Sequence, residues 1–243
     1  MAKINFEDLI LFENKDYILL NKPPLMATLD ERTQDRYHTS IIALLRKHNP
    51  DYQLCHRLDK ETSGILAVAK HPEAYRHLAI AFERRKVTKI YHAISEGIHH
   101  FEQTEATFPI LKLSKKGMVT IDFKEGQKAH TTFQTLRHIG NFTLIEARPH
   151  TGRMHQIRIH LKALKAPIVA DEMYGGKWIY LSQLKRKFKL AQEAEEQPIM
   201  RRVALHAFAL QFEGLQGEMI YQEAPYPKDF AVFLKLLEKT QYH

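Results

Sequence analysis

A guanidinium and a carboxylate lie two positions apart just before a short apolar run. Arg57 and Asp59 precede Gly64–Ala69, whose small and aliphatic residues predict a buried strand. Side chains alternate along extended backbone, so Arg57 and Asp59 point to the same side if the chain is extended there. A neighbouring cation favours the ionised form of a carboxyl group. Asp59 is therefore a candidate nucleophile, base or electrostatic stabiliser.

A second interpretation gives Asp59 only a local role. Aspartate favours turns and helix N-caps because its short carboxylate accepts nearby backbone N–H groups, and Arg57 would then be a surface ion-pair partner. For an isolated Arg-x-Asp this local role is the simpler one. The adjoining strand keeps the catalytic interpretation open, because a strand in the core is a rigid support and polar loops on such supports often carry catalytic groups.

The next candidate group is Tyr91, on a strand that we expect over Thr88–Ser95. Alternation places Lys89, Tyr91 and Ala93 on one face of this strand. A tyrosine in a strand commonly packs in the core with its hydroxyl at the boundary, and that structural role is the alternative to substrate binding.

A third stretch combines a helical pattern with basic side chains. Thr151 is the expected N-cap of a helix that starts at Met154. Four apolar residues fall on one face of that helix, namely Met154, Ile157, Leu161 and Leu164. Arg158 borders this face, where a guanidinium needs an acidic partner or a phosphate unless its head reaches solvent.

The same stretch contains no acidic residue between Arg148 and Lys165. A cluster of one sign predicts a phosphate-binding face. Its basic and imidazole residues are Arg148, His150, Arg153, His155, Arg158, His160, Lys162 and Lys165.

Three motifs resemble those of the RluA-type family of RNA pseudouridine synthases. They are His-Arg-Leu-Asp-Lys-Glu-Thr-Ser-Gly at 56–64, Lys-Ile-Tyr-His-Ala at 89–93, and Thr-Gly-Arg-Met-His-Gln-Ile-Arg-Ile-His-Leu at 151–161. Leu205-His206-Ala207 also resembles a family Leu-His-Ala, and the resemblance extends over residues 10–238. The sequence departs from the family at Pro24-Leu25-Met26, where a glycine-bearing turn is usual, and after Phe212, where a His-Pro turn is usual.

The resemblance implies a role for each motif. Asp59 would be the catalytic carboxylate, Tyr91 would pack on the target uracil, and Arg158 would pair with Asp59. Arg57 would fill the space that the extruded base leaves. Substrate binding is implied for Arg57, His56, Thr62, Arg153, His155, Gln156, Ile157 and Leu205.

Converting uridine to pseudouridine breaks the N1–C1′ bond, turns the base and joins C5 to C1′. Nothing is added or removed overall, so no cofactor is expected. Asp59 could add to C6, trap C1′ or remove a ribose proton, and the sequence leaves these three routes open. Extruding the base costs a few kcal/mol, which packing on Tyr91 and phosphate contacts would offset.

The implied fold is the α/β fold of pseudouridine synthases, a bent and mainly antiparallel sheet with flanking helices and a central cleft. We expect one catalytic domain over residues 1–243, without an S4-type RNA-binding domain. Strands are expected over 16–21, 64–69, 88–95, 129–137, 141–148 and 201–212. Helices are expected over 39–48, 72–86 and 228–239, and 178–197 reads as an exposed helix or insertion. Residues 99–127 read as a solvated hairpin region with basic tips at Lys112, Lys115 and Lys116.

Composition indicates a basic soluble protein with a polyanionic partner. The 243 residues carry 36 Lys and Arg against 28 Asp and Glu, a net charge of +8. The chain lacks an apolar membrane span, a secretory signal and a nucleotide-binding glycine motif, and a single cysteine, Cys55, excludes thiolate-rich zinc sites. Together with the resemblance, these features lead us to expect a monomeric cytoplasmic enzyme that binds a tRNA or rRNA stem-loop without a metal.

Two other classes compete with this reading. A non-catalytic RNA-binding or RNA-folding protein of the same fold would not need Asp59, Tyr91 and Arg158 together. A glycosidase acting on a free nucleoside would need a second carboxylate, for which Glu61 is the nearby candidate, although capping is the simpler role for it.

Overall fold

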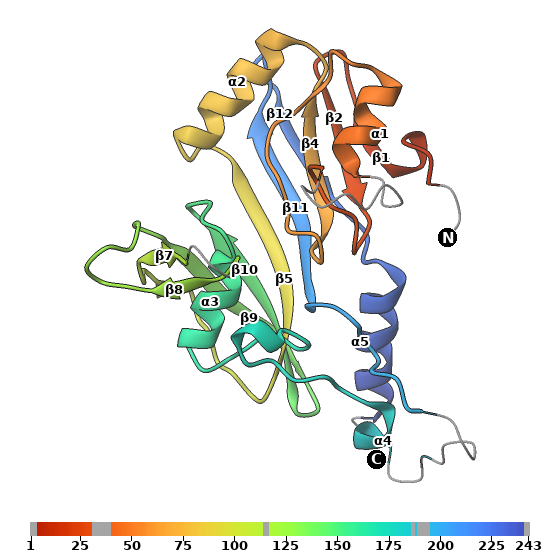
Figure 1. Cartoon of the computed structure of the whole chain (residues 1–243), viewed down its shortest axis with the longest axis vertical. Coiled ribbons are helices and arrows are strands. Elements are labelled where there is room, and N and C mark those ends of the chain that lie inside the picture. The colour runs from red at the N-terminus through yellow and green to blue at the C-terminus, as the bar shows by residue number, and fades with distance from the viewer. Residues whose placement is uncertain (1–3, 31–39, 114–116, 186–187, 189–194, 241–243) are drawn as a thin grey trace. The chain divides into compact units, whose positions relative to one another are not determined.

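The computed structural model describes residues 4–30, 40–113, 117–185, 188 and 195–240 (Figure 1). Two compact units divide the chain. Unit 1 comprises residues 1–90 and 206–226, and unit 2 comprises residues 91–205 and 227–243. No helix in the described part of the chain is both long and apolar enough to cross a membrane. The secondary structure is mixed, with helices and mainly antiparallel strands, as the sequence predicted.

Unit 1 is built around strand β4 (Ser63–Ala69), in which every residue is buried. This confirms the buried strand predicted at 64–69. β2 (Tyr17–Lys22) pairs antiparallel with β4, β1 (Ile10–Glu13) pairs with β2, and β3 (Gln53–Leu54) pairs with the last residues of β4. β11 (Leu205–Glu213) pairs in parallel with the first residues of β4 and carries β12 (Met219–Glu223) on its other half.

The helices of unit 1 begin and end at residues that satisfy their terminal backbone groups. A short 3₁₀ turn covers Glu7–Leu9. α1 (Ile41–His48) begins after Ser40, whose hydroxyl accepts the Ala43 N–H. α2 (Pro72–Glu83) packs against β4 and β3 and ends three residues before the predicted limit. Its end is a Schellman turn, in which Arg85 adopts a left-handed conformation with a φ of 58° and the Lys86 N–H reaches the Ala81 carbonyl.

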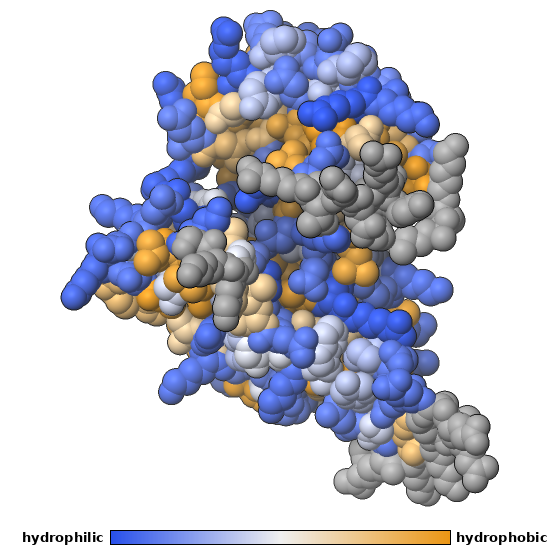
Figure 2. Space-filling view, viewed as in Figure 1, coloured by the Kyte–Doolittle hydropathy of each residue, from blue (hydrophilic) through white to orange (hydrophobic). Residues whose placement is uncertain are grey.

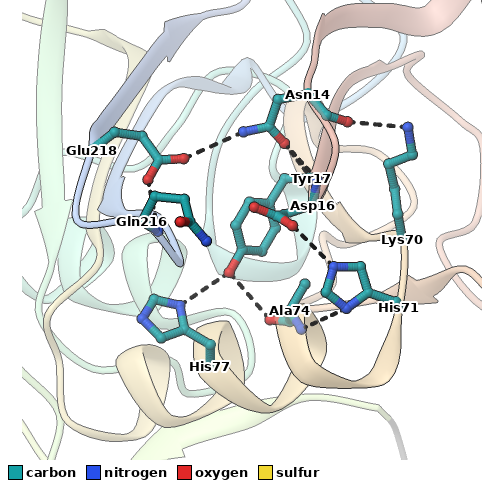
Figure 3. A network of polar contacts seen from close by, with 9 residues as sticks. All are labelled: Asn14, Asp16, Tyr17, Lys70, His71, Ala74, His77, Gln216 and Glu218. Carbon is teal, nitrogen blue, oxygen red and sulfur yellow. Dashed lines mark hydrogen bonds and ion pairs between the residues drawn. The ribbon is translucent and has the colours of Figure 1, made fainter.

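A buried polar network connects β2 to α2 (Figure 3). The Tyr17 hydroxyl lies 3.3 Å from the Ala74 carbonyl and 3.0 Å from His77 Nδ1, and burial strongly raises the pKa of this phenol. His71 joins the same elements, because Nδ1 accepts the Ala74 N–H while Nε2 contacts Asp16 Oδ1 at 3.0 Å. Tyr17 and His71 therefore hold the start of α2 against the sheet.

Unit 2 contains an antiparallel sheet in the order β5 (Thr88–Glu96), β10 (Phe142–Pro149), β9 (Thr131–Ile139) and β6 (Thr104–Ala106). The first three residues of β5 belong to unit 1. β9 and β10 form the predicted hairpin, with Gly140 at its turn at a φ of 57°. β7 (Ile110–Lys112) and β8 (Val119–Ile121) form a separate two-stranded hairpin. The Lys112 tip is described, whereas Lys115 and Lys116 lie outside the described residues.

The central helix of unit 2 is α3 (Gln156–Ala163), which packs against β8, β9, β10 and the 3₁₀ turn Glu172–Tyr174. It starts two residues later than predicted. Thr151 as the N-cap was wrong, since His155 occupies that position with a φ of 51° and makes no side-chain cap. Met154 therefore precedes the helix, although it still packs against the core cluster that includes Ile159.

The C-terminal part of unit 2 consists of α4 (Leu181–Leu184) and α5 (Lys228–Thr240). The predicted 178–197 helix is present only as α4 in the described region, and residues 186–187 and 189–194 lie outside it. α5 packs Phe233 edge-on against Phe142, and its Asp229 binds Arg202 through two hydrogen bonds of 2.7 and 3.0 Å. The predicted strand at 201–212 begins only at Leu205, because the Leu205 N–H turns back to the Val203 carbonyl at 2.8 Å and the Ala204 N–H bonds to the Val169 carbonyl at 3.0 Å.

Candidate active site

The three predicted catalytic residues belong to different units. Asp59 lies in unit 1, whereas Tyr91 and Arg158 lie in unit 2. The predicted pairing of Arg158 with Asp59 and the central cleft therefore stay predictions, and each group of residues is described within its own unit.

The Asp59 loop is fastened on both sides of the carboxylate-bearing residue. Thr28 Oγ1 donates to the Leu58 carbonyl at 2.7 Å and accepts the Leu58 N–H at 3.2 Å. The buried Lys22 ammonium donates to the Lys60 carbonyl at 3.1 Å. These bonds fix the backbone before and after Asp59, whose side chain stays half-exposed. Preorganisation of this kind is what a catalytic carboxylate requires.

Lys22 also shapes the turn that departs from the family pattern. Its Nζ donates to the Pro23 and Met26 carbonyls at 3.0 and 2.8 Å. Between them Leu25 adopts a φ of 61°, the left-handed conformation that glycine favours. Leu25 therefore holds a left-handed conformation that costs a residue with a side chain about 1–2 kcal/mol.

His56 fastens the other end of the loop to the sheet. Its Nε2 accepts the Ala67 N–H of β4 at 3.0 Å, and its ring lies 5.0 Å from that of Phe82 on α2. Burial, together with the charge of Lys89, lowers the pKa of His56 to about 3. Burial also lowers the pKa of Lys89, to about 8. His56 is therefore a neutral acceptor at physiological pH, and its internal bond occupies Nε2.

This depressed pKa predicts a loss of stability in acid. The unfolded chain protonates His56 below about pH 6.5, whereas the folded chain resists protonation down to about pH 3. The free energy of unfolding at pH 5 should therefore lie about 2 kcal/mol below its value at pH 8 through this group alone. Urea unfolding of wild type and His56→Gln at both pH values measures the difference. The same decrease in both proteins would show that His56 is not responsible.

The start of β4 is fixed by a second histidine. His206 Nε2 donates to the Ala224 carbonyl at 3.0 Å, so Nδ1 accepts the Ser63 hydroxyl at 2.9 Å. Gly64 beside it has a φ of +111°, and a Cβ there would lie 2.1 Å from the Ala207 carbonyl oxygen. Of the remaining predicted residues of unit 1, Arg57 is exposed and Thr62 is buried.

In unit 2, Arg158 has an acidic partner that the sequence analysis did not identify. Its Nε and Nη2 each donate to one carboxylate oxygen of Asp171 at 2.7 Å, and its guanidinium lies 5.0 Å from the Tyr174 ring centre. Both side chains are almost fully buried, at 5% and 1% exposed. Of the partners that the sequence left open for Arg158, an acid or a phosphate, the structure shows an acid. The sequence signal for Asp171 was its place in the turn-rich segment Ala-Asp-Glu-Met-Tyr-Gly at 170–175.

Gln156 organises the turn before α3. Its Oε1 accepts the Thr151 hydroxyl at 2.6 Å and the Arg153 N–H at 3.0 Å. Its Nε2 donates to the His130 carbonyl and to Thr131 Oγ1, both at 2.9 Å. All the polar functions of this side chain are therefore engaged inside the protein, which indicates a positioning role for the predicted substrate-binding Gln156.

The other predicted residues of unit 2 differ in exposure. Ile157 and Leu205 are buried, Tyr91 and His155 are half-buried, and Arg153 is exposed. The exposed basic surface over residues 148–165 is smaller than the sequence predicted, because Arg158 and His160 are buried. His160 Nε2 donates to the Phe108 carbonyl at 2.9 Å, and burial lowers its pKa. The exposed members are Arg148, His150, Arg153, Lys162 and Lys165.

Comparisons with known proteins agree with this arrangement of motifs. Residues 16–163 match the family described as RNA pseudouridylate synthase. Ribosomal large subunit pseudouridine synthase D of Haemophilus ducreyi is 32% identical over 96% of this chain and 71% of that protein. Synthase C of Rickettsia felis is 36% identical over 74% of this chain, which spans only 60% of that relative. The solved structure of human RNA Pseudouridylate Synthase Domain Containing 4 shares the fold, with a TM-score of 0.74, 24% identity, and coverage of 95% of this chain and 93% of that one.

The family match covers more than half of the chain and includes both Asp59 and Arg158. The relatives at 32% and 36% identity carry the same family name. The chain therefore belongs to the RNA pseudouridylate synthase family, and it is an isomerase of the RluA type.

Proposed function

We propose that this protein isomerises specific uridines in ribosomal RNA, transfer RNA or both to pseudouridine, with Asp59 as the catalytic carboxylate. The observation that carries the proposal is the fastening of the Asp59 loop by Thr28 on one side and Lys22 on the other. A loop that served only as a turn would not need two buried polar anchors around one half-exposed carboxylate. The names of the relatives favour ribosomal RNA as the first substrate to test.

In this proposal Asp59 acts at C6, at C1′ or on a ribose proton. Tyr91 packs on the uracil ring, and Arg158 stabilises the ionised carboxylate while Asp171 holds its guanidinium. The buried Gln156 and the neutral His56 position their loops, whereas the exposed Arg57 and Arg153 contact the RNA. Thr62, His155, Ile157 and Leu205 complete the walls of the substrate site. The enzyme acts in the cytoplasm as a monomer without a cofactor.

Tritium at uracil C5 gives a direct test, because the C5–C1′ bond cannot form until that hydrogen leaves. Wild-type protein should release tritium to water from labelled ribosomal or transfer RNA, and Asp59→Ala and Asp59→Asn should release none. The RNA that loses label identifies the substrate class. Tight, salt-sensitive RNA binding without any release would instead support the RNA-binding or RNA-folding role.

Glu61→Gln is the matched control, because Glu61 lies two residues from Asp59 and is the only second carboxylate that the motif offers. We expect this variant to keep most of the tritium release. A loss as large as that of Asp59→Asn, with free uracil as a product, would point to hydrolysis by two carboxylates.

A further inference from the structure

The turn after β8 is rigid. Asp122 accepts the N–H groups of Lys124 and Glu125 on one carboxylate oxygen, both at 2.8 Å, and these bonds hold the pKa of its carboxyl below the usual value. The Gly126 N–H returns to the Asp122 carbonyl at 3.0 Å. A Cβ on Gly126 would lie 2.2 Å from that same oxygen, so the turn closes too tightly for a side chain there.

This turn is also firmly rooted in unit 2. The β7–β8 hairpin packs into a core cluster made by Ile110, Val119, Ala129, Ile159 and Tyr174. The Tyr174 hydroxyl accepts the Val119 N–H at 3.0 Å, and Ile110 exchanges two backbone hydrogen bonds with Gln127. Ile159 lies on α3 beside Arg158, so the hairpin keeps a fixed position relative to the helix that carries Arg158.

The rigid turn holds Phe123 in solvent. Phe123 is 77% exposed, the highest value among the exposed large hydrophobic residues of the described region. The turn hydrogen bonds come from the neighbouring Asp122 and the backbone, so the phenyl ring has no part in closing it. A large aromatic ring presented at a preorganised tip is suited to contact a partner.

The stretch of sequence that carries this ring is cationic. Residues 110–128 contain five lysines against two acids, Asp122 and Glu125, and Asp122 is committed to the turn. Lys112, Lys124 and Lys128 are exposed, and Arg153 Nε donates to the Lys128 carbonyl at 3.1 Å. In Figure 2 the lobe that contains β7 and β8 shows mainly hydrophilic side chains, with hydrophobic ones between them.

We propose that Phe123 stacks on an unpaired nucleobase of the RNA, away from the uridine that reacts, while Lys112, Lys124 and Lys128 contact the adjoining phosphates. One aromatic ring among cations is the arrangement that binds single-stranded nucleic acid. A protein partner would instead need a contiguous apolar centre with few charges, which this lysine-rich hairpin does not offer. The proposal extends the proposed function, because it adds a second RNA contact fixed relative to α3.

Four variants test the stacking contact in the full chain. Phe123→Trp keeps an aromatic face, Phe123→Leu keeps only an apolar side chain, and Phe123→Ala removes both. Val232→Ala on α5, at another exposed apolar site, is the control. Dissociation constants for in vitro transcribed large-subunit ribosomal RNA should rise roughly 5- to 100-fold for the alanine and leucine variants. The tryptophan variant and Val232→Ala should bind like wild type, and all four should unfold at the wild-type urea concentration.

The outcomes separate this proposal from the proposed function. Equal RNA affinity in all the Phe123 variants, or affinity of the leucine variant equal to that of the tryptophan variant, would overturn stacking. Absence of tritium release by wild type would overturn the isomerase assignment while the affinity comparison still decides on Phe123.

The triple variant Lys112→Gln, Lys124→Gln, Lys128→Gln should reduce the slope of log affinity against log salt by about 2. An unchanged slope would overturn the phosphate contacts.

Discussion

Replacing Asp171 by alanine is expected to lower the free energy of unfolding by about 3–5 kcal/mol and to slow isomerisation at least about 100-fold. Asp171 binds both Nε and Nη2 of Arg158 at 2.7 Å, and neither side chain is exposed enough for water to replace the lost bonds. The guanidinium would remain buried without this carboxylate and would no longer be held by it in one orientation. Urea unfolding and single-turnover tritium release measure the two effects.

Two controls separate stability from orientation in this experiment. Arg158→Met combined with Asp171→Leu removes both charges and should recover most of the stability without recovering activity. Asp229→Ala breaks the corresponding double hydrogen bond to Arg202 and should destabilise the protein while leaving Arg158 oriented. Wild-type turnover by folded Asp171→Ala would show that the pair has no part in catalysis.

Alanine at Gly64 is expected to cost more than about 3 kcal/mol of folding free energy and to abolish activity under conditions where wild type is stable. The new Cβ would lie 2.1 Å from the Ala207 carbonyl oxygen, at a residue whose φ of +111° is already unfavourable for alanine. To relieve that overlap β11 would have to separate from β4, where the Ser63–His206 hydrogen bond lies.

Gly140→Ala is the matched control for Gly64→Ala. Gly140 also has a positive φ, of 57°, but no atom lies within 4 Å of the position of its Cβ. The Gly140→Ala variant should therefore lose only about 1–2 kcal/mol of folding free energy, which is the cost of the left-handed conformation alone. Equal midpoints of urea unfolding for the two variants would contradict the steric explanation.

The sequence predicted those strands and helices whose position depends on residues that are close together in the chain. The apolar run of β4, the alternation of β9 and β10, and the spacing of α3 were sufficient to place these elements within a few residues. The same pattern placed Arg158 at the border of a buried face and predicted an acidic partner or a phosphate for it. These predictions succeeded because burial and periodicity can be read within a single stretch of sequence.

The residues whose hydrogen bonds complete the site are far apart in the sequence. Hydrophobic periodicity therefore cannot show that they are partners. Lys22 reads as a strand-ending lysine before proline, yet its ammonium reaches the Lys60 carbonyl in a buried position. Thr28 and Leu58 are separated by 30 residues, and only the folded chain brings them together. The N-cap prediction at Thr151 failed for the same reason, because the Thr151 hydroxyl accepts the N–H of His130, 21 positions away, at 2.9 Å.

The parallel pairing of β4 with β11 has a consequence for how this enzyme is made. Ser63 and His206, which it joins, are 143 positions apart, and α5 of unit 2 follows β12 of unit 1 in the chain. Both units therefore need segments synthesised after residue 205, so neither can finish folding during the early part of translation. Such non-local closure predicts slow folding and an exposed edge of β4 in the nascent chain. Catalytic competence should thus arise in one late step, when residues 206–240 become available, and not unit by unit.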